Sequence, residues 1–354
     1  MINILKTSKS RLSSTDFSDL PFGRVFSDHM LVCHYKKGAW QEPQIIPYGS
    51  IPMNPGSQVL HYGQSVFEGM KAFKNSNNEV LFFRKEENFR RLNKSAIRLS
   101  IPEVPSDVFM HGLNELLALD SEWCKEQAGY SLYIRPFIFA SSECIKASSS
   151  EEFTFIIITS PTTTYYPGEI NLIIEESFTR ACKGGVGFAK AAGNYAATFY
   201  PTKLANAKGF QQVIWTDANK HEYIEECGTM NIWFRVGDKL ITPELSDSIL
   251  SGVTRDSIIT IAKDMDIDVQ EMKIAVDDDG RKVHLGIFRA AKRVLNELKL
   301  KDREAKRQIY LDIQAGVKRY LRIGVPSTYV NQYTFDRVLK KNYPNLLPSV
   351  VQLL

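Results

Sequence analysis

The sequence predicts a mixed α/β protein with two domains. The chain has 354 residues, which is more than one typical domain holds. Short β-rich runs are interspersed with helical patterns, and a loop-like stretch rich in proline, threonine and tyrosine separates two of the strand-like runs. We therefore expect a small N-terminal α/β domain over residues 1–160, an interdomain loop over 161–169 and a larger domain over 170–354.

Five runs have the composition of β-strands. Residues 131–139 alternate and then become apolar, whereas residues 153–159 are almost all β-branched or aromatic, as in a buried central strand. Further strands are expected over residues 170–175, 212–215 and 231–236.

Four segments have the apolar periodicity of helices. They cover residues 86–99, 108–119, 195–207 and 254–263. Gly209 is suitably placed to end the third helix, because glycine favours the left-handed conformation found there. Thr254 could cap the fourth helix with its side-chain hydroxyl. Strands and helices thus mix along the whole chain.

The composition is that of an ordinary globular protein. Hydrophobic residues make up 44% and charged residues 24%, which supports a sizeable core. The net charge of +4 points to no particular partner, and we expect neither nucleic acid nor a membrane to be one. Five cysteines lack the C-x-x-C spacing of zinc or redox sites, so we expect no metal site and a reducing compartment. Without an apolar signal core or spanning run, the sequence predicts a cytoplasmic protein.

Lys190 has unusual neighbours. It lies among the small residues and glycines of the segment 184–195, and Tyr195 follows it. Small apolar neighbours would desolvate the amine and lower its pKa, and a neutral lysine can form a Schiff base with an aldehyde. The glycines would allow a large flat ligand to approach the backbone. The alternative is a glycine-rich turn whose lysine points to water.

Two further segments could complete a cofactor site. The acidic pair Glu225 and Glu226 leads directly into a Gly-Thr turn, where a carboxylate could pair with a cationic ring nitrogen. The segment 251–255 precedes a helix, whose free N–H groups suit an anion. Arg91 could bind phosphate oxygens. A pyridoxal phosphate enzyme needs such a set, although singly each residue could be a surface residue.

At these residues the chain resembles the fold-type IV, pyridoxal phosphate-dependent branched-chain aminotransferases. The matching segments, in chain order, are residues 22–30, 60–73, 83–96, 133–136, 165–168, 184–195 and 226–231. Many motifs in the right order make the resemblance specific, and residues 60–73 are the most specific of them. It covers about the first 278 residues and implies a two-domain fold-type IV enzyme whose larger domain binds the cofactor.

The resemblance implies a role for each matching residue. Lys190 would bind the cofactor covalently and then move the α-proton of the substrate. Tyr195 would hydrogen-bond the phenolic oxygen of the cofactor. Glu226, preferred over Glu225 because it directly precedes Cys227, would pair with the ring nitrogen. Thr229 would line the ring, and the phosphate would be held by Arg91, Val253 and Thr254.

The substrate pocket also follows from the resemblance. Phe22, Tyr62, Tyr133, Arg135 and Tyr165 would build it, some of them reaching in from a partner subunit of a homodimer. Arg135 would bind the side-chain carboxylate of glutamate, and the aromatic wall would accept branched side chains. The implied reaction is reversible amino transfer between leucine, isoleucine or valine and 2-oxoglutarate, which gives branched 2-oxo acids and glutamate.

From about Asp279 the chain no longer resembles the family. The Gly-Thr-Ala type of turn that family members have there is missing. The segment from Arg281 to Arg307 contains ten lysines and arginines but only three acidic residues. A shifted reading frame is the favoured explanation, before a genuine divergent tail and a nucleic-acid-binding appendage. The alternatives in function are a D-amino acid aminotransferase, an aminodeoxychorismate lyase, and a chain made inactive by this C-terminus.

Overall fold

The computed structural model describes residues 2–127, 129–163, 169–236 and 239–276. The chain forms two compact units: Met1–Gly168 with Ala189–Ala196, and Glu169–Phe188 with Ala197–Leu354. The short segment that contains Lys190 thus belongs to the first unit, although its neighbours in sequence on both sides belong to the second. Tyr165 and the basic segment expected beyond Asp279 lie outside the described residues.

The first unit is built around a sheet of nine strands in its described part. The strands are β1 (Asn3–Ile4), β2 (His29–Lys36), β3 (Ala39–Trp40), β4 (Gln44–Pro47), β5 (Ser65–Phe67), β6 (Met70–Lys74), β7 (Val80–Phe82), β8 (Ser131–Ala140) and β9 (Phe153–Thr162). Their order is β1-β4-β2-β9-β8-β6-β7, with β3 paired to β2 and β5 paired to β8. All of these pairings are antiparallel except that of β1 with β4.

Strands β8 and β9 are the long central pair, and both were predicted. Their register runs from Ser131 opposite Thr162 to Ala140 opposite Phe153. Strand β9 therefore continues two residues into the segment expected to be a loop. Pro161 is tolerated there although it has no N–H to donate to the ladder, and it lies opposite Leu132.

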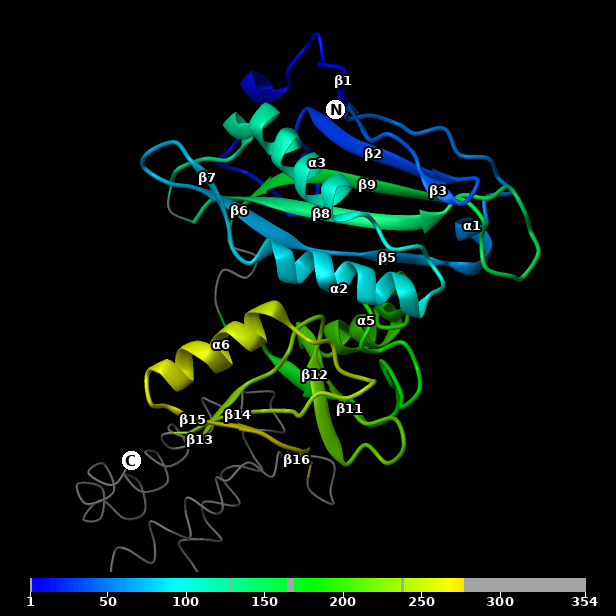
Figure 1. Cartoon of the computed structure of the whole chain (residues 1–354). Coiled ribbons are helices and arrows are strands. Elements are labelled where there is room, and N and C mark those ends of the chain that lie inside the picture. The colour runs from blue at the N-terminus through cyan, green and yellow to red at the C-terminus, as the bar shows by residue number, and fades with distance from the viewer. Residues whose placement is uncertain (1, 128, 164–168, 237–238, 277–354) are drawn as a thin grey trace, which may run out of the picture. The chain divides into compact units, whose positions relative to one another are not determined.

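Three helices precede β8 in the first unit: α1 (Val59–Tyr62), α2 (Lys85–Arg98) and α3 (Ser106–Leu119). Short 3-10 turns, η1 (Leu12–Ser14) and η2 (Ser121–Trp123), and helix α4 (Ala192–Ala196) complete the unit. Helix α3 packs on β2 and α2 lies beside β5 (Figure 1). The buried side of α3, which includes Phe109, Leu113 and Leu116, joins the main apolar core of this unit.

Helix α2 differs because its buried residues include polar ones. Leu92 and Ala96 are fully buried, as the apolar periodicity predicted. Asn88, Asn93 and Ser95 are buried with them. Buried polar groups need hydrogen-bond partners, so this face of α2 is specified by more than apolar packing.

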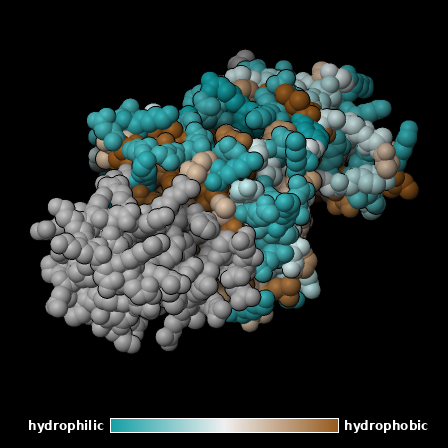
Figure 2. Space-filling model, turned by 90° about the horizontal axis from the view of Figure 1, so that it is seen from below, coloured by the Kyte–Doolittle hydropathy of each residue, from teal (hydrophilic) through white to brown (hydrophobic). Residues whose placement is uncertain are grey.

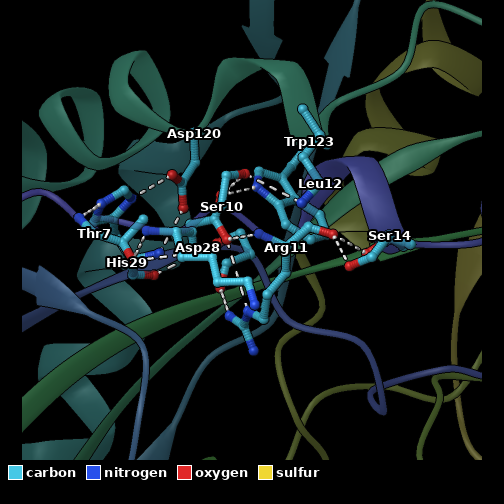
Figure 3. Close-up of polar contacts among 12 residues, drawn as sticks. Thr7, Ser10, Arg11, Leu12, Ser14, Asp28, His29, Asp120 and Trp123 are labelled. Carbon is cyan, nitrogen blue, oxygen red and sulfur yellow. Dashed lines mark hydrogen bonds and ion pairs between the residues drawn. The ribbon is translucent and has the colours of Figure 1, made fainter.

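Residues 7–11, near the N-terminus, are hydrogen-bonded to buried polar side chains at the start of β2 (Figure 3). The carboxylate of Asp28 accepts hydrogen bonds from the backbone N–H of Arg11 at 2.9 Å, the hydroxyl of Ser10 at 2.5 Å and the indole N–H of Trp123 at 3.1 Å. Burial acts to raise the pKa of Asp28, but these hydrogen bonds together outweigh it and lower the pKa below its ordinary value. Asp28 is therefore held as a carboxylate just before β2.

His29 adds a second attachment beside Asp28. Its Nδ1 lies 2.6 Å from an oxygen of the buried Asp120, and its Nε2 accepts the backbone N–H of Thr7 at 2.9 Å (Figure 3). Because Nε2 accepts, the proton lies on Nδ1 and is donated to Asp120. The residues before β2 are thus bound at two adjacent positions.

The second unit contains two small sheets and two helices in its described part. One sheet has the order β10-β11-β12-β16, with β10 (Leu172–Ile174), β11 (Gln212–Thr216), β12 (Tyr223–Cys227) and β16 (Ile274–Ala275). The other is β13-β14-β15, with β13 (Phe234–Val236), β14 (Lys239–Thr242) and β15 (Asp268–Glu271). Helix α5 (Phe199–Ala207) packs on β11, and α6 (Val253–Asp264) lies beside β15 (Figure 1).

Several expected elements have different bounds in the structure, and three of these differences have a local cause or consequence. The helix expected over 195–207 is two helices, α4 and α5, because Pro201 has no N–H for the carbonyl four residues earlier and is accepted only in the first turn of a helix. The strand expected over 231–236 begins only at Phe234. Helix α6 starts one residue earlier than expected, with Gly252 at the N-cap, so Thr254 lies inside its first turn and does not cap it.

On the face seen in Figure 2, the coloured residues are mostly hydrophilic, with hydrophobic residues between them. Phe199 and Tyr200, at the start of α5, are 69% and 60% exposed. None of the described helices combines the length and the apolar character that crossing a bilayer requires.

Candidate active site

The backbone of Lys190 is held from both sides within the first unit. Its carbonyl accepts the N–H of Phe67 at 3.0 Å, and its own N–H donates to the hydroxyl of Ser95 at 2.9 Å. The next residue, Ala191, forms an antiparallel bridge with Val66 of β5. The lysine is therefore attached to the end of β5 on one side and to α2 on the other.

The amine of Lys190 lies against two aromatic side chains, one of which is a phenol. Nζ donates to the hydroxyl of Tyr195 at 2.7 Å and lies 4.6 Å from the ring centroid of Phe67. The rings of Phe67 and Tyr195 are 4.7 Å apart. The alternative of a lysine that merely points to water does not fit these contacts. The residues next to Lys190 in sequence are small, but the neighbours of its amine in the structure are aromatic.

Arg135 and Lys190 both lie against the ring of Phe67. Its guanidinium carbon is 4.6 Å from the centroid of that ring, and Nη2 donates to the hydroxyl of Tyr133 at 2.8 Å. Nε of Arg135 is buried and has no hydrogen-bond partner among the described residues. A buried donor without a partner costs about 1–3 kcal/mol, and a carboxylate is the ligand that satisfies a guanidinium best.

The aromatic candidates are brought together only in part. Phe22 packs on Tyr133 edge-to-face, with ring centroids 5.0 Å apart, and Phe22 is 40% exposed. A side chain at Gly69 would collide with the Tyr133 hydroxyl, so the glycine lets this phenol reach its position. Among the described residues, the hydroxyl of Tyr62 bonds to the carbonyl of Ile145 and not to another candidate.

Arg91 is mostly buried and bound by a carboxylate, although its charged neighbours in sequence suggested a solvated face. Its side chain is 12% exposed, and that of Glu68 is fully buried. Nε and Nη2 of Arg91 donate to the two oxygens of Glu68 at 2.6 and 2.8 Å. Asn88 donates to the same carboxylate at 2.9 Å. This bidentate pair fixes the plane of the guanidinium.

In the second unit, Glu226 is a buried carboxylate with several donors. One of its oxygens accepts the backbone N–H of Leu250 at 2.7 Å and the side-chain amide of Asn231 at 3.3 Å. The other lies 3.0 Å from Nε of Arg180. Asn231 also donates to the carbonyl of Leu250 at 2.8 Å. These contacts bind the end of β12 to the segment that leads into α6.

The remaining candidates of the second unit lie in loops and at a helix end. Thr229 is exposed in the tight turn that Cys227 and Met230 close with two backbone hydrogen bonds, and Gly228 there has φ +55°. Val253 and Thr254 form the first turn of α6, which is 12 residues long. The N–H groups of a first helical turn have no partner within the helix and suit an anion.

Burial changes the acidity of the groups around Glu226. Burial raises the pKa of Glu225, although the hydroxyl of Ser248 and the charge of Arg180 act in the opposite direction. Burial and the nearby charge of Glu226 raise the pKa of Cys227 to about 12, so this thiol stays protonated at neutral pH. Within the described part of the chain, no three His, Cys, Asp or Glu side chains form a group that could hold a metal.

Several residues with contacts in these sites had no role in the sequence analysis, among them Phe67, Glu68, Ser95 and Arg180. Phe67 and Glu68 lie inside the most specific motif, so the signal was present but did not say what each residue touches. Ser95 also lies in a matching motif. Arg180 stands outside every motif, and only the folded chain places it beside Glu226.

Comparison with known proteins identifies the family. Residues 65–280 match the model of amino-transferase class IV, which is more than half of the chain. A probable branched-chain-amino-acid aminotransferase of Staphylococcus aureus is 46% identical over 269 residues, which cover 74% of this chain and 75% of that protein. Branched-chain-amino-acid aminotransferase 2 of Bacillus subtilis is 44% identical over 283 residues, covering 77% and 78%.

Solved structures agree with this assignment. The crystal structure of Escherichia coli branched-chain amino acid aminotransferase has a TM-score of 0.57 and 28% identity, and the match covers 70% of this chain and 79% of that one. The T.th. branched-chain amino acid aminotransferase complexed with N-(5'-phosphopyridoxyl)-L-glutamate has a TM-score of 0.59 and 25% identity, covering 72% and 79%. The chain belongs to the class IV aminotransferases and has their fold-type IV architecture.

Proposed function

We propose that this protein is a pyridoxal phosphate-dependent branched-chain amino acid aminotransferase. It transfers the amino group reversibly between leucine, isoleucine or valine and 2-oxoglutarate. Relatives named for this activity are 42–46% identical over about three quarters of the chain. The structural observation that carries the proposal is the Lys190 amine, bonded to Tyr195 and held by its backbone between β5 and α2.

The residues of both units fit the cofactor. A lysine amine, a phenol and a fixed guanidinium lie in the first unit, and a buried carboxylate and a helix start lie in the second. Pyridoxal phosphate, when bound, supplies an electron-withdrawing ring that stabilises negative charge at the substrate α-carbon. Lys190 would bind the cofactor and move the α-proton, because its amine can both accept and return a proton.

The other residues would bind and orient. Tyr195 would donate to the phenolic oxygen of the cofactor, and Glu226 would pair with its ring nitrogen. Arg180, 3.0 Å from the other carboxylate oxygen of Glu226, would help to hold that carboxylate in place for this pairing. Thr229 would line the ring. Arg91, Val253 and Thr254 would hold the phosphate by charge and by backbone N–H groups.

The substrate would be bound by the residues around Tyr133. Arg135 would take the side-chain carboxylate of glutamate, which its buried and unpartnered Nε supports. Phe22, Tyr62 and Tyr133 would form the apolar wall for branched side chains, and Tyr165 stays a sequence-based proposal. Such a wall separates leucine from valine by only about 1–3 kcal/mol, so we expect all three branched amino acids to react.

We also propose a homodimer in the cytoplasm. The exposed Tyr62 and Phe22 are the candidates that would complete a pocket together with a partner subunit. The described chain has five free cysteines and no disulfide among them, which suits a reducing compartment.

An amino-donor panel tests the proposal. Purified protein with pyridoxal phosphate, 2-oxoglutarate and L-leucine, L-isoleucine or L-valine should form glutamate, and Lys190→Ala should not. Activity with D-alanine in place of the branched donors would identify a D-amino acid aminotransferase. Absence of glutamate with every donor would contradict the proposed activity.

A further inference from the structure

Arg91 and Lys190 belong to one closed set of contacts in the first unit. The carboxylate of Glu68 binds the side chain of Arg91, and the hydroxyl of Ser95 donates to the carbonyl of Arg91 at 2.8 Å. The same hydroxyl oxygen accepts the N–H of Lys190, whose carbonyl accepts the N–H of Phe67, the residue before Glu68. The set therefore returns to its starting point, and we call it the Glu68–Ser95 circuit.

The burial of its members makes this circuit stiff. Glu68 and Ser95 have no exposed surface, and the side chain of Arg91 is 12% exposed. A buried carboxylate without partners would be strongly unfavourable, but Glu68 has Arg91, Asn88 and the N–H of Gly69. Moving Arg91 away would break two charge-assisted hydrogen bonds at once, so its guanidinium has one preferred position.

The hydroxyl of Ser95 contacts the backbone of Lys190 and not the guanidinium of Arg91. Its hydroxyl bonds back to the residue four positions earlier, a common geometry for serine in helices. What is unusual is that the oxygen then accepts an N–H from Lys190, 95 residues away in sequence. Helix α2 thereby holds the lysine backbone through Ser95 and carries Arg91 one turn earlier.

We propose that Glu68 and Ser95 are positioning residues: Glu68 fixes Arg91 for the cofactor phosphate, and Ser95 fixes Lys190 at a set distance from it. This inference rests on the proposed function. A rigid spacing matters because the cofactor is bonded at its aldehyde carbon and held at its phosphate, so an error at one end strains the other. Substitutions of Glu68 and of Ser95 should therefore change cofactor binding in different ways.

Binding of two aldehydes to the apoenzyme tests the Glu68 part. Titration with pyridoxal phosphate and with pyridoxal, which lacks the phosphate, gives two dissociation constants from the visible spectrum. We expect Glu68→Gln to weaken pyridoxal phosphate binding about tenfold, as the loss of one charge-assisted hydrogen bond implies, and to change pyridoxal binding less than about twofold. Glu87→Gln is the matched control, since Glu87 pairs with Arg90 on the exposed side of the same helix.

Ser95→Ala tests the other part. Both aldehydes bond to the lysine, so we expect both dissociation constants to rise by a similar factor, about threefold to tenfold, with their ratio unchanged. Thr260→Ala is its control, because Thr260 makes the same bond to the carbonyl four residues earlier in α6 and is exposed. Circular dichroism and thermal unfolding of each variant show that the fold is kept.

The outcomes separate the inference from the function. Wild-type protein that binds pyridoxal as tightly as pyridoxal phosphate would contradict the proposed phosphate site itself. The role of Glu68 would be overturned if wild type prefers pyridoxal phosphate over pyridoxal and Glu68→Gln keeps the same preference. It would also be overturned if Glu68→Gln increases this preference, because the charge of Arg91 is then no longer paired with Glu68. As a second check, Glu68→Gln should add no further loss to Arg91→Lys, because Glu68 acts through Arg91. A Ser95→Ala variant with both dissociation constants unchanged would overturn the role of Ser95.

Discussion

Asp28→Asn is expected to destabilise the first unit. Asp28 accepts three hydrogen bonds with its two oxygens, from Arg11, Ser10 and Trp123 (Figure 3). Asparagine has one acceptor oxygen, so its NH2 group must face either the backbone N–H of Arg11 or the indole N–H of Trp123. Both of these groups are donors and cannot accept a hydrogen bond from the NH2 group. A hydrogen bond to a charged group contributes about 1.5–3 kcal/mol. We expect the free energy of unfolding to fall by about 2–4 kcal/mol.

The effect should depend on pH in a defined direction. The pKa of Asp28 is lowered in the folded protein, so its contribution is present above the unfolded pKa of about 3.9. It is lost as the pH falls through the lower folded value. Wild type and variant should therefore differ most near pH 7 and converge progressively below about pH 4.

Urea unfolding followed by tryptophan fluorescence measures the unfolding free energy at each pH, and Trp123 is a suitable probe because it contacts Asp28. Asp16→Asn is the control: Asp16 also accepts from a serine, Ser18, but it is exposed, so its loss should leave the unfolding free energy unchanged. An Asp28→Asn variant that matches this control, or a difference from wild type that stays constant down to pH 3, would refute the reasoning.

Three further substitutions test other contacts. Tyr195→Phe removes the hydroxyl bonded to Lys190, so kcat with L-leucine should fall about tenfold or more while circular dichroism stays unchanged. Glu226→Gln removes the carboxylate that is ion-paired with the buried Arg180 and should lower the unfolding free energy by about 3–5 kcal/mol, measured by urea titration. Gly187→Ala would place a Cβ 2.6 Å from the backbone of Ser248, so a drop of about 1–3 kcal/mol in the same titration is expected.

The fold class and the long buried elements could be predicted because they follow from local pattern, whereas strands β1 to β7 were not among the expected elements. The continuous apolar run of β9 and the apolar periodicity of α2 and α3 each report burial on one side or both. Element ends were less accurate where one residue decides them. Pro201 divides the expected long helix, and Gly252, not Thr254, precedes α6.

The candidate site was predictable to the extent that its residues lie in motifs. Lys190, Tyr195 and Glu226 stand out by sequence, and the structure gives each of them buried or aromatic partners. The glycines were interpreted as making room for a flat ligand. At Gly187 the structure gives a different reason, since a side chain there would collide with Ala181 and the backbone near Ser248.

Partners that are distant in sequence could not be predicted. Arg91 stands between Arg90 and Lys94, and nothing local shows that Glu68 arrives from the end of β5 to bury it. Ser95 looks like an ordinary helix residue until Lys190 donates to it. Long-range hydrogen bonds of this kind arise from tertiary packing, which local propensity does not encode.

The central claim is that Lys190 binds the cofactor covalently. Borohydride reduction of the protein with pyridoxal phosphate makes such a bond permanent, and mass spectrometry of the tryptic peptides locates it. The account predicts the added pyridoxyl phosphate mass on the peptide that contains Lys190, and none there after reduction of the protein without the cofactor. Labelling of another lysine in its place, or of no lysine, would contradict the account.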